Sequence, residues 1–403
     1  MNELKTKNYF EYFFLSIIFL YALHLCFVNN YGWDWDTYAM LETFIKIKEE
    51  GYYIRSRGAG YLLPEIGIGF LSFYLGSLAV NLLTFSFLIV GLIFLFLAFE
   101  NLKFKKEELN KKIFLFIILC LTNHVVIRDS TIPMDYSWSF MFYSIALYSL
   151  INNKTEWSIL FFALCFGSRF NFIAFIIPTI MFLDKRILKF ELKLLHLAII
   201  TFFGCLFYVP SWLNNEFSLS FIYSEQAGFK TNSIFSFEEI ARFSFKLLKT
   251  FGIFSFIYIF YLLFRKRKKL IKEKFLLIII FFNFLVFFIF PWEPSFLWLS
   301  IFTIFFIIVI NFNYKVVYFL IFLNIFNWFY QAEIVKIFYN NDDGCIRNPI
   351  NAEFQPHFSK GIVLAINERF KATSCYPELL SRNKEILIMK YKNEIKSGKK
   401  LKN

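Results

Sequence analysis

Residues 33–65 read WDWDTYAMLETFIKIKEEGYYIRSRGAGYLLPE and form a long polar segment between two strongly apolar runs, residues 9–29 and 66–99. A helix needs about 20 mostly apolar residues to cross a membrane, and both flanking runs reach that length. The first run lacks a small-residue cleavage site and is followed by further apolar runs, so we interpret it as a retained helix and not as a signal peptide. The polar segment is therefore expected to be a loop at one face of a membrane.

The composition excludes an ordinary soluble domain. Of the 403 residues, 58% are hydrophobic and 61 are Phe, which leaves too little polar surface for a globular protein in water. We predict an all-α polytopic membrane protein with about eleven transmembrane helices. The predicted spans are residues 9–29, 66–99, 113–127, 136–151, 157–168, 170–183, 194–210, 244–264, 275–290, 296–312 and 315–331.

The positions of Lys and Arg predict the orientation of these helices. Short loops on the cytoplasmic side carry an excess of both residues. With a cytoplasmic N-terminus, the basic clusters at 103–112, 185–193 and 265–274 all lie inside, and the loop at about 30–65 lies on the extracytoplasmic side. These loops and the C-terminal tail account for most of the net charge of +13, so we assign no nucleic-acid partner to the chain.

The stretch 157–183 is short for two spans, and Ser168-Arg169-Phe170-Asn171 interrupts it at its centre. We predict two half-length helices with Arg169 near their outer tip, because a single tilted helix would move two basic clusters outside. An arginine at such depth faces a cavity, a lipid headgroup or an acid. A structural ion pair and a ligand contact both stay open as interpretations of Arg169.

Beyond the last predicted span the chain becomes polar, and its end is rich in lysine. We therefore divide it into a transmembrane module, residues 1–331, and a small polar tail, residues 332–403. An odd number of spans places this tail outside, where Cys345 and Cys375 can form a disulfide. The lysines near the end would suit a cytoplasmic face equally well.

Carboxylates gather in the expected outer loops. Asp34 and Asp36 follow the first span, and Asp129 and Asp135 lie between the third and fourth spans. A carboxylate can act as a general base on an acceptor hydroxyl group. Asp36 is also suited to cap the helix expected to follow it, and Asp129 can simply pair with Arg128.

Arginines follow the acids within the first loop. Arg55 and Arg57 stand beside the glycine turn Gly58-Ala59-Gly60, where a guanidinium group can approach a phosphate with two parallel hydrogen bonds. Contact with lipid headgroups is the alternative interpretation. The turn lacks the lysine and the preceding strand of a nucleotide-binding loop. An acidic and a basic cluster at one membrane face suit a reaction on a phosphate-bearing lipid.

The order of these motifs resembles the first extracytoplasmic loop of GT-C glycosyltransferases. In that family an acidic pair follows the first span, and a Ser-Arg-x-Pro-Gly-Tyr-Pro-like segment precedes the second. The matching positions are Asp34-x-Asp36-x-Tyr38, Gly51-x-Tyr53, Ser56-Arg57-x-x-Gly60-Tyr61 and Pro64-Glu65. Ala59 and Leu63 depart from the pattern, since proline is common at those places. The long loop at 211–243 and the segment Pro291-Trp292-Glu293-Pro294 fit the same general layout.

The resemblance implies an integral membrane enzyme whose extracytoplasmic loops form the active site and whose donor is a sugar linked to polyprenyl phosphate or diphosphate. The implied roles are catalytic carboxylates at Asp34, Asp36, Asp129 and Asp135; donor phosphate contacts at Arg55, Arg57, Tyr61 and Arg169; and cavity-lining acids at Glu65 and Glu293. Some members of the family need a divalent cation such as Mg²⁺ or Mn²⁺, for which Asp36 and Asp129 are the candidate ligands.

We therefore expect transfer of a sugar to a glycan, lipid or protein acceptor at the periplasmic face of a bacterial inner membrane. Two alternatives stay open. A polysaccharide polymerase or ligase has a similar number of spans and basic outer loops. A transporter or lipid flippase would show internal repeats or broken helices at matched positions in two halves.

Overall fold

The computed structural model describes residues 9–28, 35–53, 55, 61–102, 109–184, 187–213, 237–271, 273–289 and 294–338. These residues form helices and turns without a strand, which confirms the all-α prediction for this part of the chain. The helices are α1 (Tyr9–Val28), α2 (Trp35–Glu50), α3 (Leu62–Asn101), α4 (Leu109–Leu121), α5 (His124–Ser130), α6 (Tyr136–Ile151), α7 (Thr155–Ser168), η2 (Phe170–Phe172), α8 (Ile173–Phe182), α9 (Phe190–Leu206), α10 (Val209–Leu213), α12 (Phe237–Phe251), α13 (Ile253–Arg265), α14 (Arg267–Leu270), α15 (Lys274–Ile289), η4 (Pro294–Leu297), α16 (Trp298–Asn311) and α17 (Tyr314–Phe338).

The helices coincide closely with the apolar runs of the sequence, but many of them are short. By length and apolar composition, one helix among the described residues, α3, is able to cross a membrane. Helices α4 and α5 would make a second span together, but they meet at an angle of 84°, and further apolar helices have 10–17 residues. At 1.5 Å per residue, such helices cover about 15–26 Å, against the roughly 30 Å of a hydrocarbon core. The prediction of about eleven full-length spans is not met by this criterion.

Helix α3 is not straight, although the run 66–99 was expected to be one span. Gly76 has φ of 82° and ψ of 177°, a non-helical conformation inside the element. A Cβ atom at Gly67 would lie 2.7 Å from the Trp138 ring, and Phe87 makes an edge contact with the same ring at 4.9 Å. Gly67 precedes Gly76 and Phe87 follows it, and both contact the Trp138 side chain. The two halves of α3 therefore fold back on each other. Glycine allows this because it has no Cβ penalty at positive φ.

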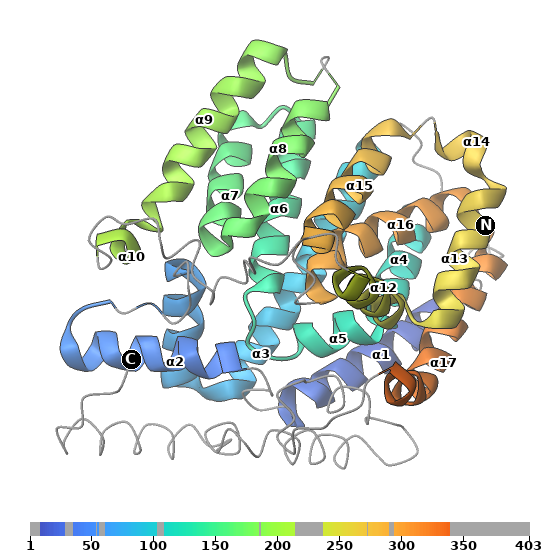
Figure 1. Cartoon of the computed structure of the whole chain (residues 1–403), viewed down its shortest axis with the longest axis horizontal. Coiled ribbons are helices and arrows are strands. Elements are labelled where there is room, and N and C mark those ends of the chain that lie inside the picture. The colour runs from blue at the N-terminus through green and yellow to red at the C-terminus, as the bar shows by residue number, and fades with distance from the viewer. Residues whose placement is uncertain are drawn as a thin grey trace.

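The prediction of a break at Arg169 is confirmed. Arg169 is extended, with φ of −151° and ψ of 116°, between α7 and η2. The Tyr208 hydroxyl group, beyond the end of α9, donates to the Phe166 carbonyl near the end of α7 at 2.6 Å. Lys193, in the first turn of α9, donates to the carbonyls of Met181 and Leu183 at 2.9 and 2.5 Å. Helices α7 and α8 are therefore antiparallel, and Arg169 lies at the turn between them (Figure 1).

The core between α3, α4, α6 and α16 is built largely from aromatic rings. Phe306 of α16 contacts Phe96 and Phe99 of α3 at ring-centre distances of 5.2 and 5.1 Å. Phe140 of α6 lies 4.7 Å from Phe302 of α16. Close packing of these rings gives α6 a firm position through dispersion and edge-to-face contacts. The start of α6 carries one of the predicted site residues, Asp135.

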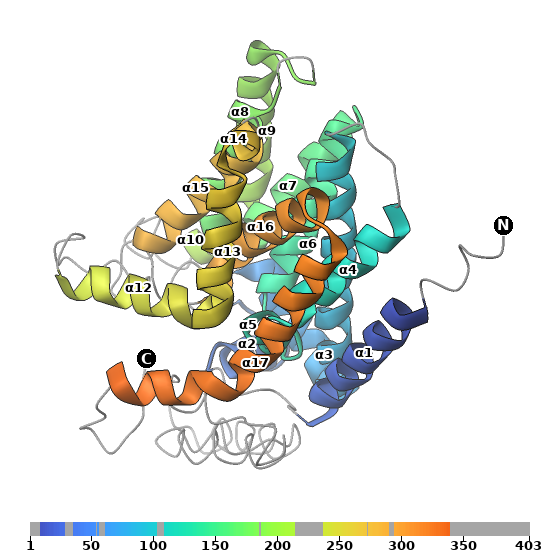
Figure 2. The same cartoon turned by 90° about the vertical axis from the view of Figure 1, so that its right-hand side faces the viewer.

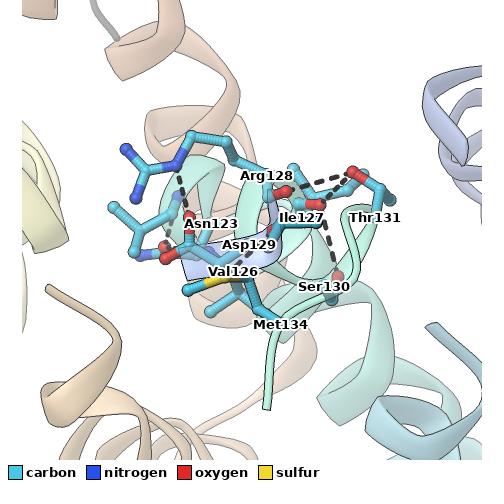
Figure 3. Close-up of polar contacts among 10 residues, drawn as sticks. Asn123, Val126, Ile127, Arg128, Asp129, Ser130, Thr131 and Met134 are labelled. Carbon is cyan, nitrogen blue, oxygen red and sulfur yellow. Dashed lines mark hydrogen bonds and ion pairs between the residues drawn. The ribbon is translucent and has the colours of Figure 1, made fainter. Parts of the chain in front are cut away.

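Side chains of asparagine join two interrupted helix pairs, α4 with α5 and α12 with α13. Asn123 caps α5, since its Oδ1 atom accepts from the amides of Val125 and Val126, and its Nδ2 atom donates to the Thr250 carbonyl at 2.8 Å (Figure 3). Gly252, with φ of 73°, separates α12 from α13. Figures 1 and 2 show that these two helices run in different directions, so the predicted span 244–264 is in fact two elements.

Helix α17 supplies the remaining polar contacts near the α4–α5 and α12–α13 breaks. Asn324 accepts from the Ser255 hydroxyl group at 2.8 Å and donates to the Leu119 carbonyl at 3.3 Å. Asn327 donates to the Ser255 hydroxyl group at 2.6 Å. These bonds satisfy polar groups that the helix breaks expose in an apolar region. Helix α17 continues to Phe338, so it crosses the expected boundary between the module and the tail at 331.

Candidate functional site

An ion pair between Asp135 and Arg169 forms the centre of the candidate site. The Nη1 atom of Arg169 lies 2.8 Å from the Oδ1 atom of Asp135, and both side chains are buried. Asp135 occupies the N-cap position of α6, yet its side chain makes no capping hydrogen bond. A carboxylate at this position ordinarily accepts from the helix amides. Here it accepts from an arginine that lies 34 residues away in the sequence.

Aromatic rings surround the Arg169 guanidinium group. Its Cζ atom lies 3.8 Å from the ring centre of Tyr136, 5.0 Å from that of Phe296 and 5.8 Å from that of Tyr61. A cation over an aromatic face gains roughly 0.5–2 kcal/mol, more where water is excluded. The rings come from the starts of α6 and α3 and from η4. They fix the position of a guanidinium group at the point where these elements meet.

Tyr208 joins the α9 segment to this group of rings. Its ring centre is 6.4 Å from that of Tyr61 and 5.9 Å from that of Phe170, with both pairs in edge-to-face geometry. Its hydroxyl group is held by the Phe166 carbonyl. The side chain therefore packs the α9 end of the molecule against the residues that surround Arg169.

A second charged group lies at the beginning of α3. Glu65 is fully buried, and its Oε2 atom accepts from the Tyr53 hydroxyl group at 2.5 Å. Burial lowers the pKa of Arg55 below its usual value, while the negative charge of Glu65 acts in the opposite direction. Tyr61 follows this loop and lies beside Arg169, so the two charged groups are neighbours. Three of the predicted donor contacts, Arg55, Tyr61 and Arg169, thus belong to one region.

Asp129 does not join Asp135. Its Oδ1 atom is 2.5 Å from the Nε atom of Arg128, and both side chains are buried on α5 (Figure 3). This is the pairing with the neighbouring residue that the sequence left open. A carboxylate held in this way is less available to a metal or an acceptor hydroxyl group.

The start of α2 lies close to Asp135. Thr37, which follows Asp36, donates its hydroxyl group to the Pro133 carbonyl at 3.3 Å. Asp36 is the second residue of α2, because the helix begins at Trp35. The helix was expected to start after Asp36, with Asp36 suited to cap it, and instead it starts one residue before Asp36.

Several predicted residues lie outside the described part of the chain. These are Asp34, Arg57, Glu293, Cys345 and Cys375. Among the residues that the structure does describe, no three His, Cys, Asp or Glu side chains come close enough together to hold a metal ion. The two candidate metal ligands from the sequence, Asp36 and Asp129, therefore stay a prediction.

The structure adds residues that sequence reasoning did not select. These are Tyr53, Tyr136, Tyr208, Ser211 and Phe296. Two of them carried a signal: Tyr53 stands in the motif Gly51-x-Tyr53, and Tyr136 follows Asp135. The other three carried none, because aromatic residues and serines are abundant throughout the chain. Together the site offers the buried Arg169, the half-buried Arg55, two buried carboxylates and aromatic surfaces at one place, and guanidinium groups are the usual contacts of an anionic ligand.

The chain matches no protein-family model, no curated protein and no solved structure.

Proposed function

We propose that the chain is a multi-pass protein of a bacterial inner membrane. Large apolar side chains point outward from several helices, among them Phe13 of α1, Phe202 of α9 and Phe260 of α13, which are 65%, 63% and 65% exposed. Soluble monomers rarely expose large contiguous apolar surfaces, whereas lipid tails accept them. Helices of 10–17 residues fit this proposal where neighbouring helices, asparagine side chains and local thinning of the bilayer satisfy their ends.

The loops expected outside and the loops expected inside gather at two different places in the fold. This separation supports an N-terminus in the cytoplasm. Segments expected outside meet at the candidate site, through Glu65, Asp135, Arg169 and Tyr208. Segments expected inside meet elsewhere, as Asn101 donates to Asn152 at 3.3 Å beyond the ends of α3 and α6. Successive membrane spans place alternate loops on opposite sides in this way. The candidate site then faces the periplasm.

The reaction that this site supports best is sugar transfer of the GT-C type. The donor is a sugar on polyprenyl phosphate or diphosphate, and the acceptor is a glycan, a lipid or a protein. An acceptor oxygen bonds to the anomeric carbon, the bond from that carbon to the phosphate oxygen breaks, and a carboxylate takes the acceptor proton. Arg55, Arg57 and Arg169 stabilise the departing phosphate. Asp34 and Asp36 are the candidate carboxylates, because Asp129 and Asp135 are each paired with a buried arginine. A divalent cation such as Mg²⁺ or Mn²⁺ can assist.

One observation carries this proposal: the buried Asp135–Arg169 pair lies beside the Arg55 and Glu65 loop, although the sequence separates them widely. Buried charges are costly unless they serve a purpose or are fully compensated. A structural pair alone does not require a further arginine and a further carboxylate at the same place.

The proposal is tested by mass spectrometry of glycolipids and surface glycans from four strains at equal protein levels. These carry the wild-type chain, the Asp34→Asn/Asp36→Asn double variant, the Asp184→Asn variant and no chain. Asp184 is exposed at the opposite end of α8, and its change to Asn removes a negative charge outside the candidate site. We expect the double variant and the deletion to lose one sugar and to accumulate its polyprenyl-linked donor, while Asp184→Asn matches the wild type. A normal glycan profile in the double variant would overturn the assignment of these two carboxylates.

Transport of a lipid-linked sugar is the second candidate function. It is favoured by the helix breaks at Gly76, Asn123 and Gly252, because transporters commonly use broken helices inside the membrane. A transporter moves the lipid-linked sugar without changing its mass, whereas a transferase removes the sugar. The composition of the lipid therefore separates the two functions.

A further inference from the structure

The turn that leads from α13 to α15 presents basic side chains at the surface. Its exposed cations come from the end of α13, the short helix α14 and the first residue of α15, and we call them the basic corner: Arg265, Arg267, Lys268 and Lys274. Glu273, the one acid in the stretch 265–274, is less exposed than these four residues. The surface of the corner is therefore positively charged.

Hydrogen bonds and one buried leucine fix the backbone of the basic corner. The amides of Leu270 and Ile271 donate to the carbonyls of Lys266 and Arg267 at 3.1 and 3.0 Å, and the Glu273 amide donates to the Leu270 carbonyl at 2.8 Å. Leu270 is 5% exposed and belongs to the hydrophobic core. Because the backbone is already ordered, a ligand that binds these cations loses less entropy than it would on a loose loop.

An outward-facing strip of rings on α13 leads up to the cations. The Cζ atom of Arg267 lies 4.4 Å from the centre of the Phe264 ring. Phe264, Tyr261 and Phe260 are 60%, 53% and 65% exposed, and they lie within little more than one turn of the helix. A positive charge at the end of an apolar strip matches a molecule with an anionic head and hydrocarbon tails.

The turn between α16 and α17 adjoins the basic corner. The Nζ atom of Lys266 lies 5.9 Å from the centre of the Phe312 ring in that turn. Lys315 follows Phe312 by three residues and is exposed. A second loop that is expected in the cytoplasm therefore adds a cation near the corner.

The basic corner lies away from the candidate site. Figures 1 and 2 show α14 at the same end of the molecule as the turn between α8 and α9. That turn and the basic corner both belong to the loops expected in the cytoplasm. The surface of the cytoplasmic leaflet is negative, since anionic phospholipids gather there, and it attracts basic residues next to membrane helices.

We propose that the basic corner binds the phosphate group of an anionic phospholipid of the cytoplasmic leaflet, with the acyl chains along the outer face of α13. The inference rests on the membrane location and orientation proposed above and does not require sugar transfer. A general excess of lysine attracts anionic lipid without selecting a place. The corner selects one, because Arg267 is stacked on Phe264 beside the exposed apolar face of α13.

The test measures lipid binding to the purified full-length protein in detergent by native mass spectrometry. The probes are phosphatidylglycerol, which is anionic, phosphatidylcholine, which has no net charge, and the soluble headgroup glycerol phosphate. The variants are Arg267→Gln/Lys268→Gln and Phe264→Ala. The control Lys154→Gln/Lys189→Gln removes the same charge from two exposed positions in other loops expected in the cytoplasm. Thermal unfolding checks that each variant is folded.

We expect the wild type to bind phosphatidylglycerol roughly tenfold more tightly than phosphatidylcholine, and less tightly as salt is raised. Arg267→Gln/Lys268→Gln should weaken binding of phosphatidylglycerol roughly tenfold. Phe264→Ala should weaken it about two- to threefold, although the charge is unchanged. The control should stay within about twofold of the wild type.

Three results would overturn the inference. Equal binding of the two phospholipids would show no preference for an anionic headgroup, and an equal loss in the control would show attraction by overall charge alone. Glycerol phosphate bound as tightly as the lipid would indicate a site for a free phosphate compound. A chain that transfers no sugar leaves the lipid result intact, and a wrong orientation is detected by cysteine labelling, so failure of the proposed function is distinguishable.

Discussion

Arg169 and Asp135 are joined at 2.8 Å between the tip of the α7–α8 hairpin and the first turn of α6. Asp135 lies at an N-cap position but directs its carboxylate to Arg169 instead of the helix amides. The pair therefore decides both where the hairpin docks and where a positive charge is placed.

The effects on stability of changing Asp135 and of changing Arg169 should depend strongly on each other. Asp135→Ala leaves the Arg169 charge buried without its acid, which typically costs about 3–5 kcal/mol. The double variant Asp135→Leu/Arg169→Met should be more stable than Asp135→Ala, because it leaves no buried charge. Thermal unfolding of the purified variants in detergent measures this. A double variant less stable than Asp135→Ala would contradict the coupling.

Two glycines with similar backbone angles should respond differently to substitution. Gly252 has φ of +73°, and a Cβ atom there would lie 2.2 Å from Asn327; Gly51 has φ of +79° and nothing within 4 Å. Gly51→Ala should cost about 1–2 kcal/mol from backbone strain alone. Gly252→Ala should cost clearly more, because the asparagine must also move. Equal losses of thermal stability in the two variants would count against the packing at Gly252.

Asn123 should contribute more to stability than an ordinary helix asparagine. Asn123→Ala removes the cap of α5 and the bond to the Thr250 carbonyl, so we expect a loss of about 2–3 kcal/mol. Asn311→Ala is the matched control, since the Asn311 side chain donates to the Ile307 carbonyl one turn earlier in the same helix. Its loss should stay below about 1 kcal/mol. Thermal unfolding should therefore give a lower melting temperature for Asn123→Ala than for Asn311→Ala.

The orientation can be tested with single cysteines. Tyr52 and Lys154 are both exposed and are expected on opposite sides of the membrane. In a chain with its six cysteines replaced by serine, Tyr52→Cys should react with a membrane-impermeant maleimide in intact cells. Lys154→Cys should react only after the membrane is opened. Labelling of both positions from the same side would contradict the proposed topology.

The sequence predicted the helix positions well because apolar runs separated by charged loops are a strong signal. It also predicted the break at Arg169, where a charged residue and an asparagine interrupt a run that is too short for two full spans. The reversal at Gly76 was not predictable, since a glycine in an apolar run is often simply tolerated. Its positive φ depends on how Trp138 packs between the two halves of α3.

Four charged residues selected from the sequence, Arg55, Glu65, Asp135 and Arg169, lie in one region of the structure, but the side chains around them could not be predicted. Asp135 and Arg169 were chosen for rare charges next to apolar runs, and Arg55 for its place beside a glycine turn. Their mutual contacts depend on helix packing, which periodicity does not encode. No sequence signal distinguished Tyr208 and Phe296 from the other aromatic residues among 61 Phe and 22 Tyr. The pairing of Asp129 with Arg128 depends on the short helix α5, whose start is set by Asn123.

The most direct measurement is a reaction of the purified chain, reconstituted in vesicles, with the lipid extract of cells that lack it. Mass spectrometry follows the polyprenyl lipids with the wild-type chain and with Asp34→Asn/Asp36→Asn. The account predicts that the wild type converts one polyprenyl-linked sugar into free polyprenyl phosphate or diphosphate and a glycosylated acceptor, and that the double variant does not. A donor that keeps its mass and only changes leaflet would contradict sugar transfer and establish transport instead.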